Sequence, residues 1–249
     1  MKFLIVGDSH TQYFGLTNQV RAFMPTLRGI KSTAKVVSAS TVSGVGKLDS
    51  TLALGENIKL WKEQENPDFL VLNLGQVDVE LGLPFRQFVQ GSSETPEYWL
   101  DYFVEKYFEY LVSLELNDAK LIVKGINLPV LCYDWKKAIK YISRIVTDRF
   151  SDSTEDAKRK DAVVAALNEN YMSDILRTDL ARSFNLKLKK KCDELGFGYF
   201  DINEQLTDSS SEMIHPRFIP SKFDHHVTDS LEVRLVHWKA LLGVARNMN

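Results

Sequence analysis

The chain has 249 residues, of which 44% are hydrophobic and 26% charged, so it can bury a sizeable core and is typical of a globular protein. Its formal net charge of −2 provides no basic surface of the kind that binds nucleic acid or an anionic membrane. No apolar run approaches the roughly 18 residues that cross a bilayer, and the first residues do not resemble a signal peptide. We therefore expect a cytoplasmic protein without nucleic-acid or membrane partners.

Short apolar runs bounded by turn residues predict buried parallel strands. In chain order they cover residues 2–6, 34–38, 69–74, 120–124 and 198–202. Apolar residues at helical spacing, at 16–27 and 52–61, separate the first three runs. Alternating strands and helices form βαβ units, so the pattern predicts a three-layer α/β/α sandwich around a mostly parallel five-stranded sheet.

Two segments are longer than such a sandwich needs. Residues 85–96 are polar and follow the third strand, whereas residues 128 to about 182 separate the fourth strand from the fifth. The longer segment carries an aromatic and basic run at 135–141, a charged run at 152–161 and an amphipathic stretch at 162–176. We expect a mostly helical insertion that borders the active site, within a single domain of residues 1–249, because open α/β sheets bind ligands where their strands end.

The run Gly7-Asp8-Ser9-His10 ends the first predicted strand. A glycine permits a tight turn there, and the serine that follows can expose its hydroxyl above the sheet. The competing interpretation is an N-cap, in which Asp8 or Ser9 only closes the next helix. His10 either lies at the mouth of a pocket or is an ordinary residue of the first helical turn.

The run Ile5-Val6-Gly7-Asp8-Ser9 resembles the first block of SGNH (GDSL-type) hydrolases. Three later runs, each after a predicted strand, resemble the other blocks of that family: residues 38–46, 73–78 and 223–227. The resemblance implies the flavodoxin-like SGNH fold, Ser9 as the nucleophile, an Asp/His pair of the last block as its base, and no cofactor or metal. A hydroxyl becomes a good nucleophile when an imidazole accepts its proton and a carboxylate orients that imidazole.

The second and third blocks bear on the oxyanion hole. The family uses the amide of the nucleophilic serine, a second-block glycine and a third-block asparagine, so the resemblance assigns Gly44 first and Gly46 second. The third block here reads Gly75-Gln76-Val77-Asp78, with valine in place of the asparagine, and valine cannot donate a hydrogen bond. Gln76 can replace that donor only if the turn begins before it, since neighbouring side chains of a strand point to opposite faces. We place Gln76 and Asp78 with the pocket.

The last block reads Asp224-His225-His226, in which the acid is closer to the histidines than the three residues usual in the family. We favour His226 as the base, oriented by Asp224, and keep His225 as the alternative. Arg217 lies just before this block; it either contacts a carboxylate or sugar hydroxyl of the substrate or belongs to a solvated loop.

The resemblance implies a serine esterase or O-acyltransferase acting on O-acyl esters of small molecules or polysaccharides, with O-acetylated carbohydrate as the leading substrate class. Two alternatives remain open. Val77 and the shortened last block favour a catalytically impaired glycan-binding or scaffold protein. Asp224, His225 and His226 also offer ligands for a metal-dependent phosphoesterase, although no companion metal motif is found. The sequence does not determine the acyl group, the acceptor or the oligomeric state.

Overall fold

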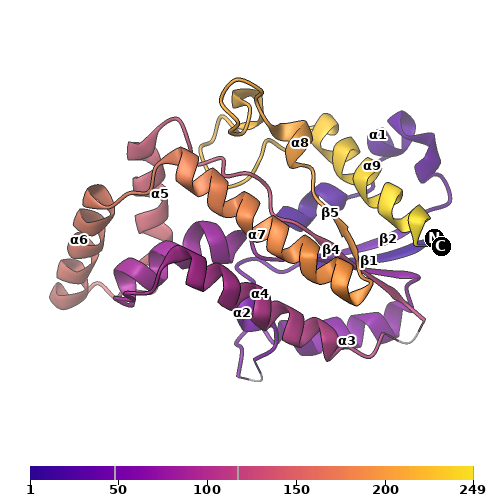
Figure 1. Ribbon diagram of the computed structural model, residues 1–249, viewed down its shortest axis with the longest axis horizontal. Coiled ribbons are helices and arrows are strands. Elements are labelled where there is room, and N and C mark those ends of the chain that lie inside the picture. The colour runs from indigo at the N-terminus through magenta and orange to yellow at the C-terminus, as the bar shows by residue number, and fades with distance from the viewer. Residues whose placement is uncertain (48, 117, 249) are drawn as a thin grey trace.

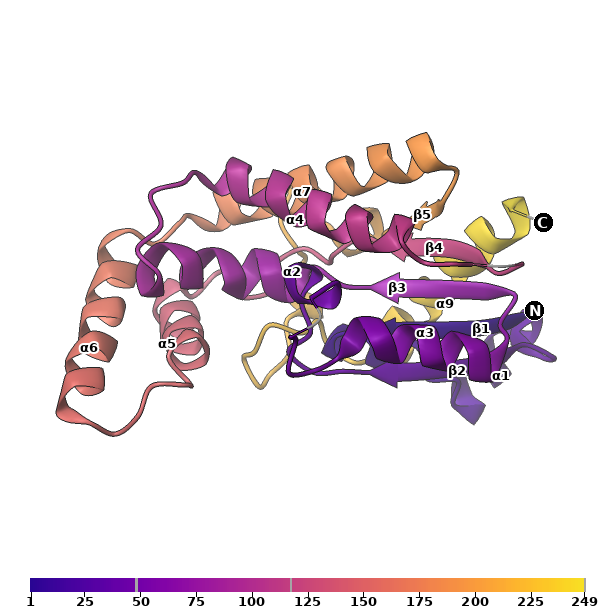
Figure 2. The same cartoon turned by 90° about the horizontal axis from the view of Figure 1, so that it is seen from below.

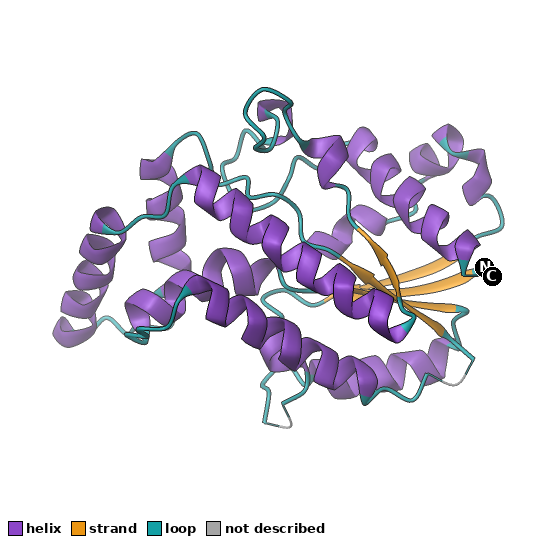
Figure 3. Ribbon diagram, in the orientation of Figure 1, coloured by secondary structure: helices purple, strands orange, loops and turns teal. Residues whose placement is uncertain are grey.

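The computed structural model describes residues 1–47, 49–116 and 118–248. Within them, a five-stranded parallel sheet has the order β2-β1-β3-β4-β5 (Figure 1). The strands are β1 (Lys2–Gly7), β2 (Lys31–Val36), β3 (Phe69–Asn73), β4 (Lys120–Lys124) and β5 (Gly198–Phe200). Helices cover both faces of the sheet (Figure 3), so the structure confirms the predicted α/β/α sandwich, with a flavodoxin-like strand order.

The two strands whose observed bounds differ most from the predictions lie at the edges of the sheet. β2 begins at Lys31, which pairs with Lys2, and not at residue 34, because an edge strand with solvent on one side mixes polar and apolar residues. β5 ends at Phe200 and not at residue 202, because the chain turns at Asp201, whose carboxylate accepts the N–H of Asn203. Apolar runs therefore located the buried central strands better than the edges.

Alternation along the strands divides the core in two. Leu4 and Val6 of β1 face one side, where they pack with α2 (Val42–Val45), α3 (Leu54–Glu65), α4 (Pro96–Val112) and α7 (Asp174–Leu195). Phe3 and Ile5 face the other side, with η1 (Ser9–Phe14), α1 (Asn18–Phe23) and α9 (Leu231–Asn247). None of the helices in the described ranges combines the length and apolar character that a membrane span requires. The remaining short elements are η2 (Pro25–Leu27), η3 (Asp78–Gly82), η4 (Phe85–Val89), α8 (Asn203–Leu206) and η5 (Pro216–Phe218).

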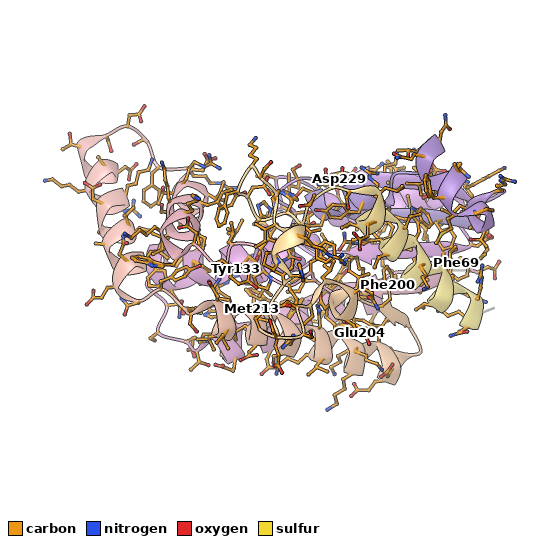
Figure 4. The ribbon with its side chains drawn as sticks, turned by 90° about the horizontal axis from the view of Figure 1, so that it is seen from above. Phe69, Tyr133, Phe200, Glu204, Met213 and Asp229 are labelled. Carbon is orange, nitrogen blue, oxygen red and sulfur yellow. The ribbon has the colours of Figure 1, made fainter. Side chains whose placement is uncertain are left out.

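The segment between β4 and β5 carries α5 (Trp135–Val146), α6 (Thr154–Glu169) and α7, and Figure 2 shows α5 and α6 beyond the end of the sheet to which the β3 arrow points. The amphipathic stretch 162–176 is divided between two helices, because Asn170 ends α6 and the Ser173 side chain caps the start of α7. α5 and α6 form a third apolar cluster with η3 and η4. Tyr133, which precedes α5, lies near Met213 in Figure 4, and its hydroxyl donates to the Ile214 carbonyl at 2.8 Å.

Candidate active site

The turn after β1 is set by close backbone contact with β3. The Asp8 N–H donates to the Asn73 carbonyl at 3.2 Å, and a Cβ on Gly7 would lie only 2.0 Å from that oxygen. Only glycine fits there. The 3₁₀ turn η1 then begins at Ser9, capped by the Asp8 carboxylate, which accepts the N–H of His10. Ser9 consequently stands above the carboxyl edge of the sheet, as expected.

The loop before α9 brings a histidine onto Ser9. Nε2 of His226 lies 2.7 Å from the Ser9 hydroxyl, and its Nδ1 lies 3.2 Å from Oδ1 of Asp224. The same carboxylate oxygen accepts the His226 backbone N–H at 2.8 Å. Because a carboxylate only accepts, these partners place the proton on Nδ1 and leave the Nε2 lone pair for the serine. The structure thus forms a hydrogen-bonded chain of hydroxyl, imidazole and carboxylate.

His225 has other partners than Ser9. Its Nδ1 lies 2.5 Å from the hydroxyl of Tyr141, a residue of α5. Burial lowers the pKa of His225 to about 2, with further contributions from His10 and His226, so this ring is neutral throughout the physiological range. Burial also lowers the pKa of His226, followed by the effect of His10, while Asp224 opposes the shift. Of the two histidines proposed as base, His226 is the one in contact with Ser9.

His10 lies beneath these rings and not at the mouth of a pocket. Its side chain is 1% exposed, Nδ1 lies 3.0 Å from Oδ1 of Asp8, and Nε2 lies 3.1 Å from the His225 carbonyl. Its ring stacks on that of His226, with centroids 4.5 Å apart. His10 therefore contacts both the turn that carries Ser9 and the loop that carries His226.

The second block forms the short helix α2, which Asp78 of the third block caps. The buried Asp78 carboxylate accepts the N–H groups of Val42 and Ser43 at 2.7 and 3.3 Å, and the Ser43 hydroxyl at 3.0 Å. Burial raises the pKa of Asp78 to about 6, although these hydrogen bonds lower it. The Gly44 N–H donates to the Thr41 carbonyl at 3.2 Å. The Asp78 side chain thus holds the second block in place by binding the backbone of that block.

Gly46 and Gln76 also have partners within the protein. A Cβ on Gly46 would lie 3.5 Å from the side chain of Tyr110, so Gly46 packs against α4. The Gln76 carboxamide binds the backbone of Asn127 in both directions, accepting its N–H at 2.8 Å and donating to its carbonyl at 3.1 Å. Gln76 therefore joins the segments after β3 and β4, and its carboxamide is engaged away from Ser9.

Arg217 lies apart from the Ser9–His226–Asp224 chain. Its guanidinium binds Glu232 of α9 at 2.9 Å and lies over the ring of Phe218, and its side chain is 56% exposed. This is the environment of a solvated loop residue, the second of the two interpretations of Arg217.

Sequence reasoning missed two parts of the site. Tyr141 belongs to the insertion, whose sequence gives no sign that one tyrosine reaches the last block. The pairing of Asp8 with His10 did have a signal, because Asp8-Ser9-His10 repeats the Asp-x-His spacing of Asp224-His225-His226.

Three histidines meet closely enough to be considered as a metal site. One ring nitrogen from each of His10, His225 and His226 lies within 4.8 Å of the others. However, both nitrogens of His10 and His226 and Nδ1 of His225 already have protein partners. A metal ion bound by all three rings would have to displace one of these partners of His10 and one of those of His226.

The chain matches no protein-family model and no curated protein. It is similar to solved structures along its whole length. A GDSL-like lipase from Bacteroides thetaiotaomicron matches with a TM-score of 0.53 and 11% identity, over 99% of this chain and 88% of that one. A catalytic mutant of an acetylxylan esterase from Geobacillus stearothermophilus, with serine replaced by alanine, matches with a TM-score of 0.52 and 13% identity. This match covers 100% of this chain and 94% of that one.

A carbohydrate acetylesterase from Sinorhizobium meliloti gives a TM-score of 0.54 and 13% identity, over 98% of this chain and 99% of that one. At such low identity these matches establish the architecture of the chain, and each neighbour's activity is its own. The chain therefore has the three-layer α/β/α fold of these lipase and acetylesterase structures.

Proposed function

We propose that the protein is a serine esterase that acts on O-acyl esters, with Ser9 as nucleophile, His226 as general base and Asp224 as the residue that orients His226. The observation that carries this proposal is the hydrogen-bonded chain of Ser9 Oγ, His226 and Asp224 at 2.7 and 3.2 Å. A hydroxyl, an imidazole and a carboxylate in this order are the groups that activate serine in acyl transfer.

The reaction has two steps on this arrangement. Ser9 Oγ attacks the ester carbonyl carbon while its proton passes to Nε2 of His226; the bond from carbon to the leaving oxygen then breaks, and His226 returns the proton to that oxygen. A water or another hydroxyl then attacks the carbonyl carbon of acyl-Ser9 while its proton passes to His226. The bond from that carbon to Ser9 Oγ breaks, His226 returns the proton to Ser9 Oγ, and the acid or the new ester is released. Asp224 keeps the His226 proton on Nδ1 and stabilises the imidazolium in both steps.

The oxyanion requires donors, and the candidates are main-chain amides. The N–H of Ser9 makes no hydrogen bond with the residues that the structure describes, so it is available to the oxyanion. The Gly44 N–H can join it by giving up its long bond to Thr41. Gln76 and Asp78 then act by holding the two loops. Loss of a side-chain donor costs roughly 100-fold to 1000-fold in kcat, so we expect a slower enzyme than one with the asparagine.

O-acetylated carbohydrate is the substrate class we propose. Support comes from the acetylxylan esterase and the carbohydrate acetylesterase among the structural neighbours. The acetylxylan esterase is present as two catalytic mutants, one with serine and one with aspartate replaced by alanine. We further propose that residues 1–249 form one domain in which α5 borders the site. Tyr141 of α5 contacts His225 in the base loop, the loop before α9 that carries His225 and His226.

Labelling by a fluorophosphonate probe and hydrolysis of p-nitrophenyl acetate test the proposal. We expect both in the unmodified protein, and we expect Ser9→Ala and His226→Ala to lower hydrolysis by a factor on the order of 10⁴ or more. Ser93→Ala, an exposed serine, is the matched control, and His225→Ala should retain far more activity than His226→Ala.

The alternatives predict different results. A protein that neither labels nor hydrolyses the ester but binds acetylated glycan would be the impaired binder suggested by Val77. Activity that disappears with a chelator and survives Ser9→Ala would indicate a metal enzyme built on the histidine cluster. Either result refutes the serine esterase.

A further inference from the structure

Two Asp-x-His units lie side by side in the site and share one local geometry. Oδ1 of Asp8 accepts the backbone N–H of His10 at 2.9 Å and faces its Nδ1 at 3.0 Å. Oδ1 of Asp224 does the same for His226, at 2.8 and 3.2 Å. The two rings stack at 4.5 Å with an angle of 26° between their planes. The environment of the second ring nitrogen is what distinguishes the two units.

The second nitrogen of each ring faces a different kind of group. Nε2 of His226 faces the hydroxyl of Ser9, which can donate a proton to it. Nε2 of His10 faces the carbonyl of His225, which can only accept. Since Nδ1 of His10 also faces an acceptor, the Asp8 carboxylate, a neutral His10 ring would leave one nitrogen lone pair against an oxygen lone pair. Imidazole is a stronger base than carboxylate, so the shared proton resides on His10.

The surroundings of His10 favour this charge. The ionisable groups around it are Asp8, Tyr13, Glu80, His225, His226 and His237, from η1, η3, α9 and the base loop. Burial lowers the pKa of His10, but the charge and hydrogen bond of Asp8 and the carbonyl of His225 more than offset it, so the net shift is upward. Burial lowers the pKa of each of the other three histidines.

We propose that His10 is a permanently protonated positioning residue, whose imidazolium fastens the His226 loop to the Ser9 turn and, through the stacked rings, disfavours a second positive charge on His226. The effect of His10 on His226 as a base rests on the proposed function. If His10 disfavours a charge on His226, then His226 remains an uncharged base in mildly acidic solution. Besides burial, the charge of His10 lowers the pKa of His226, and the Asp8 carboxylate opposes this effect. Both side chains of the Asp8–His10 pair are 1% exposed, so neither charge lies at the surface.

Nitrogen-15 NMR of the histidine rings tests the protonation state without reference to activity. We expect both ring nitrogens of His10, assigned by their loss in His10→Gln, to carry a proton from about pH 5.5 to above 7, past the ordinary histidine pKa. In Asp8→Asn the stabilising carboxylate is absent, and we expect His10 to lose one proton within this range. An unprotonated nitrogen on His10 at pH 7 in the unmodified protein would overturn the proposal. If His10→Gln fails to fold, the ring signals are assigned through bonds from the His10 backbone instead.

The pH dependence of ester hydrolysis tests the effect on His226. Without the neighbouring cation the pKa of His226 rises, so a larger fraction of His226 is protonated and inactive as a base in acidic solution. We therefore expect the ratio of His10→Gln to unmodified activity to be about tenfold smaller at pH 5.5 than at pH 8. His215→Gln, a control at a half-buried histidine outside the cluster, should give a constant ratio.

The two measurements separate the two proposals. A constant ratio for folded His10→Gln would mean that His10 acts through packing alone, and would refute its electrostatic role. Absence of any esterase activity in the unmodified protein would refute the proposed function, while the NMR result would still decide whether His10 is permanently charged.

Discussion

Lys124, at the carboxyl end of β4, is a buried cation beside the site, and replacing it with methionine tests the electrostatics of this region. Lys124 is only 1% exposed. Its Nζ donates hydrogen bonds to the Gly125 carbonyl at 2.8 Å and to Oδ1 of Asn127 at 2.9 Å. Burial lowers its pKa from 10.5 to about 8, although Asp201 and Asp8 oppose the shift. A buried lysine with a lowered pKa reduces the free energy of unfolding as long as its amino group is charged.

The magnitude follows from the two pKa values. Because the folded-state pKa lies below the unfolded one, the ionised Lys124 destabilises the fold by about 3 kcal/mol at pH 7, and the stability returns as the pH rises from about 8 to 10.5. At pH 9.5 about 1.4 kcal/mol of the penalty remains. Lys124→Met removes this pH dependence. The substitution also leaves the two acceptors of Nζ without a hydrogen bond, which lowers the free energy of unfolding by the same amount at every pH.

The assay is urea unfolding of both proteins at pH 7 and pH 9.5. We expect the unmodified protein to gain about 2 kcal/mol relative to Lys124→Met between these two values. Lys140→Met, an exposed lysine of α5, is the control and should show a constant difference. A difference for Lys124→Met that does not change with pH would refute the lowered pKa of Lys124.

Two further changes test the contacts that hold the loops of the site. Asp78→Ala removes the cap of α2 and leaves buried N–H groups unpaired, so we expect the free energy of unfolding to fall by about 2–4 kcal/mol in urea; a loss no larger than that of Glu97→Ala, an exposed acid of α4, would contradict this. Tyr141→Phe leaves Nδ1 of His225 unpaired and should lower both the stability, by about 1–3 kcal/mol, and kcat for p-nitrophenyl acetate. Tyr171→Phe, in the same insertion, should lower stability only, and equal losses of kcat would argue against a role of α5 in the site.

The fold was predictable because its signals are local. Central strands such as Phe69–Asn73 and Lys120–Lys124 are covered by helices on both faces, so each appears in the sequence as an apolar run between turn residues. The turn at Gly7 and Ser9 was predictable for the same reason, since strand, glycine and serine follow one another directly. The edge strand β2 was placed less well because one of its sides is partly exposed, and β5 because Asp201, which follows it, turns the chain through its hydrogen bond with Asn203.

The insertion shows the limit of periodicity. Residues 162–176 have one apolar pattern, but two caps, at Ser153 and Ser173, start separate helices on either side of residue 170. Both caps are serines followed by acidic residues, which is a local signal that the amphipathic pattern concealed. By contrast, nothing in the sequence near Tyr141 indicates its contact with His225, 84 positions away.

The sequence by itself determined the sandwich, the position of Ser9 and the presence of an acid with two histidines in the last block, because each depends on neighbouring residues. Only the tertiary structure decided which histidine meets Ser9, since His225 and His226 are adjacent in sequence and the direction of each ring depends on the folding of the loop against η1 and α5. It likewise decided that Gln76 binds Asn127, because that contact exists only where β4 lies beside β3. Side-chain partners across a parallel sheet depend on the order of its strands, which no single segment encodes.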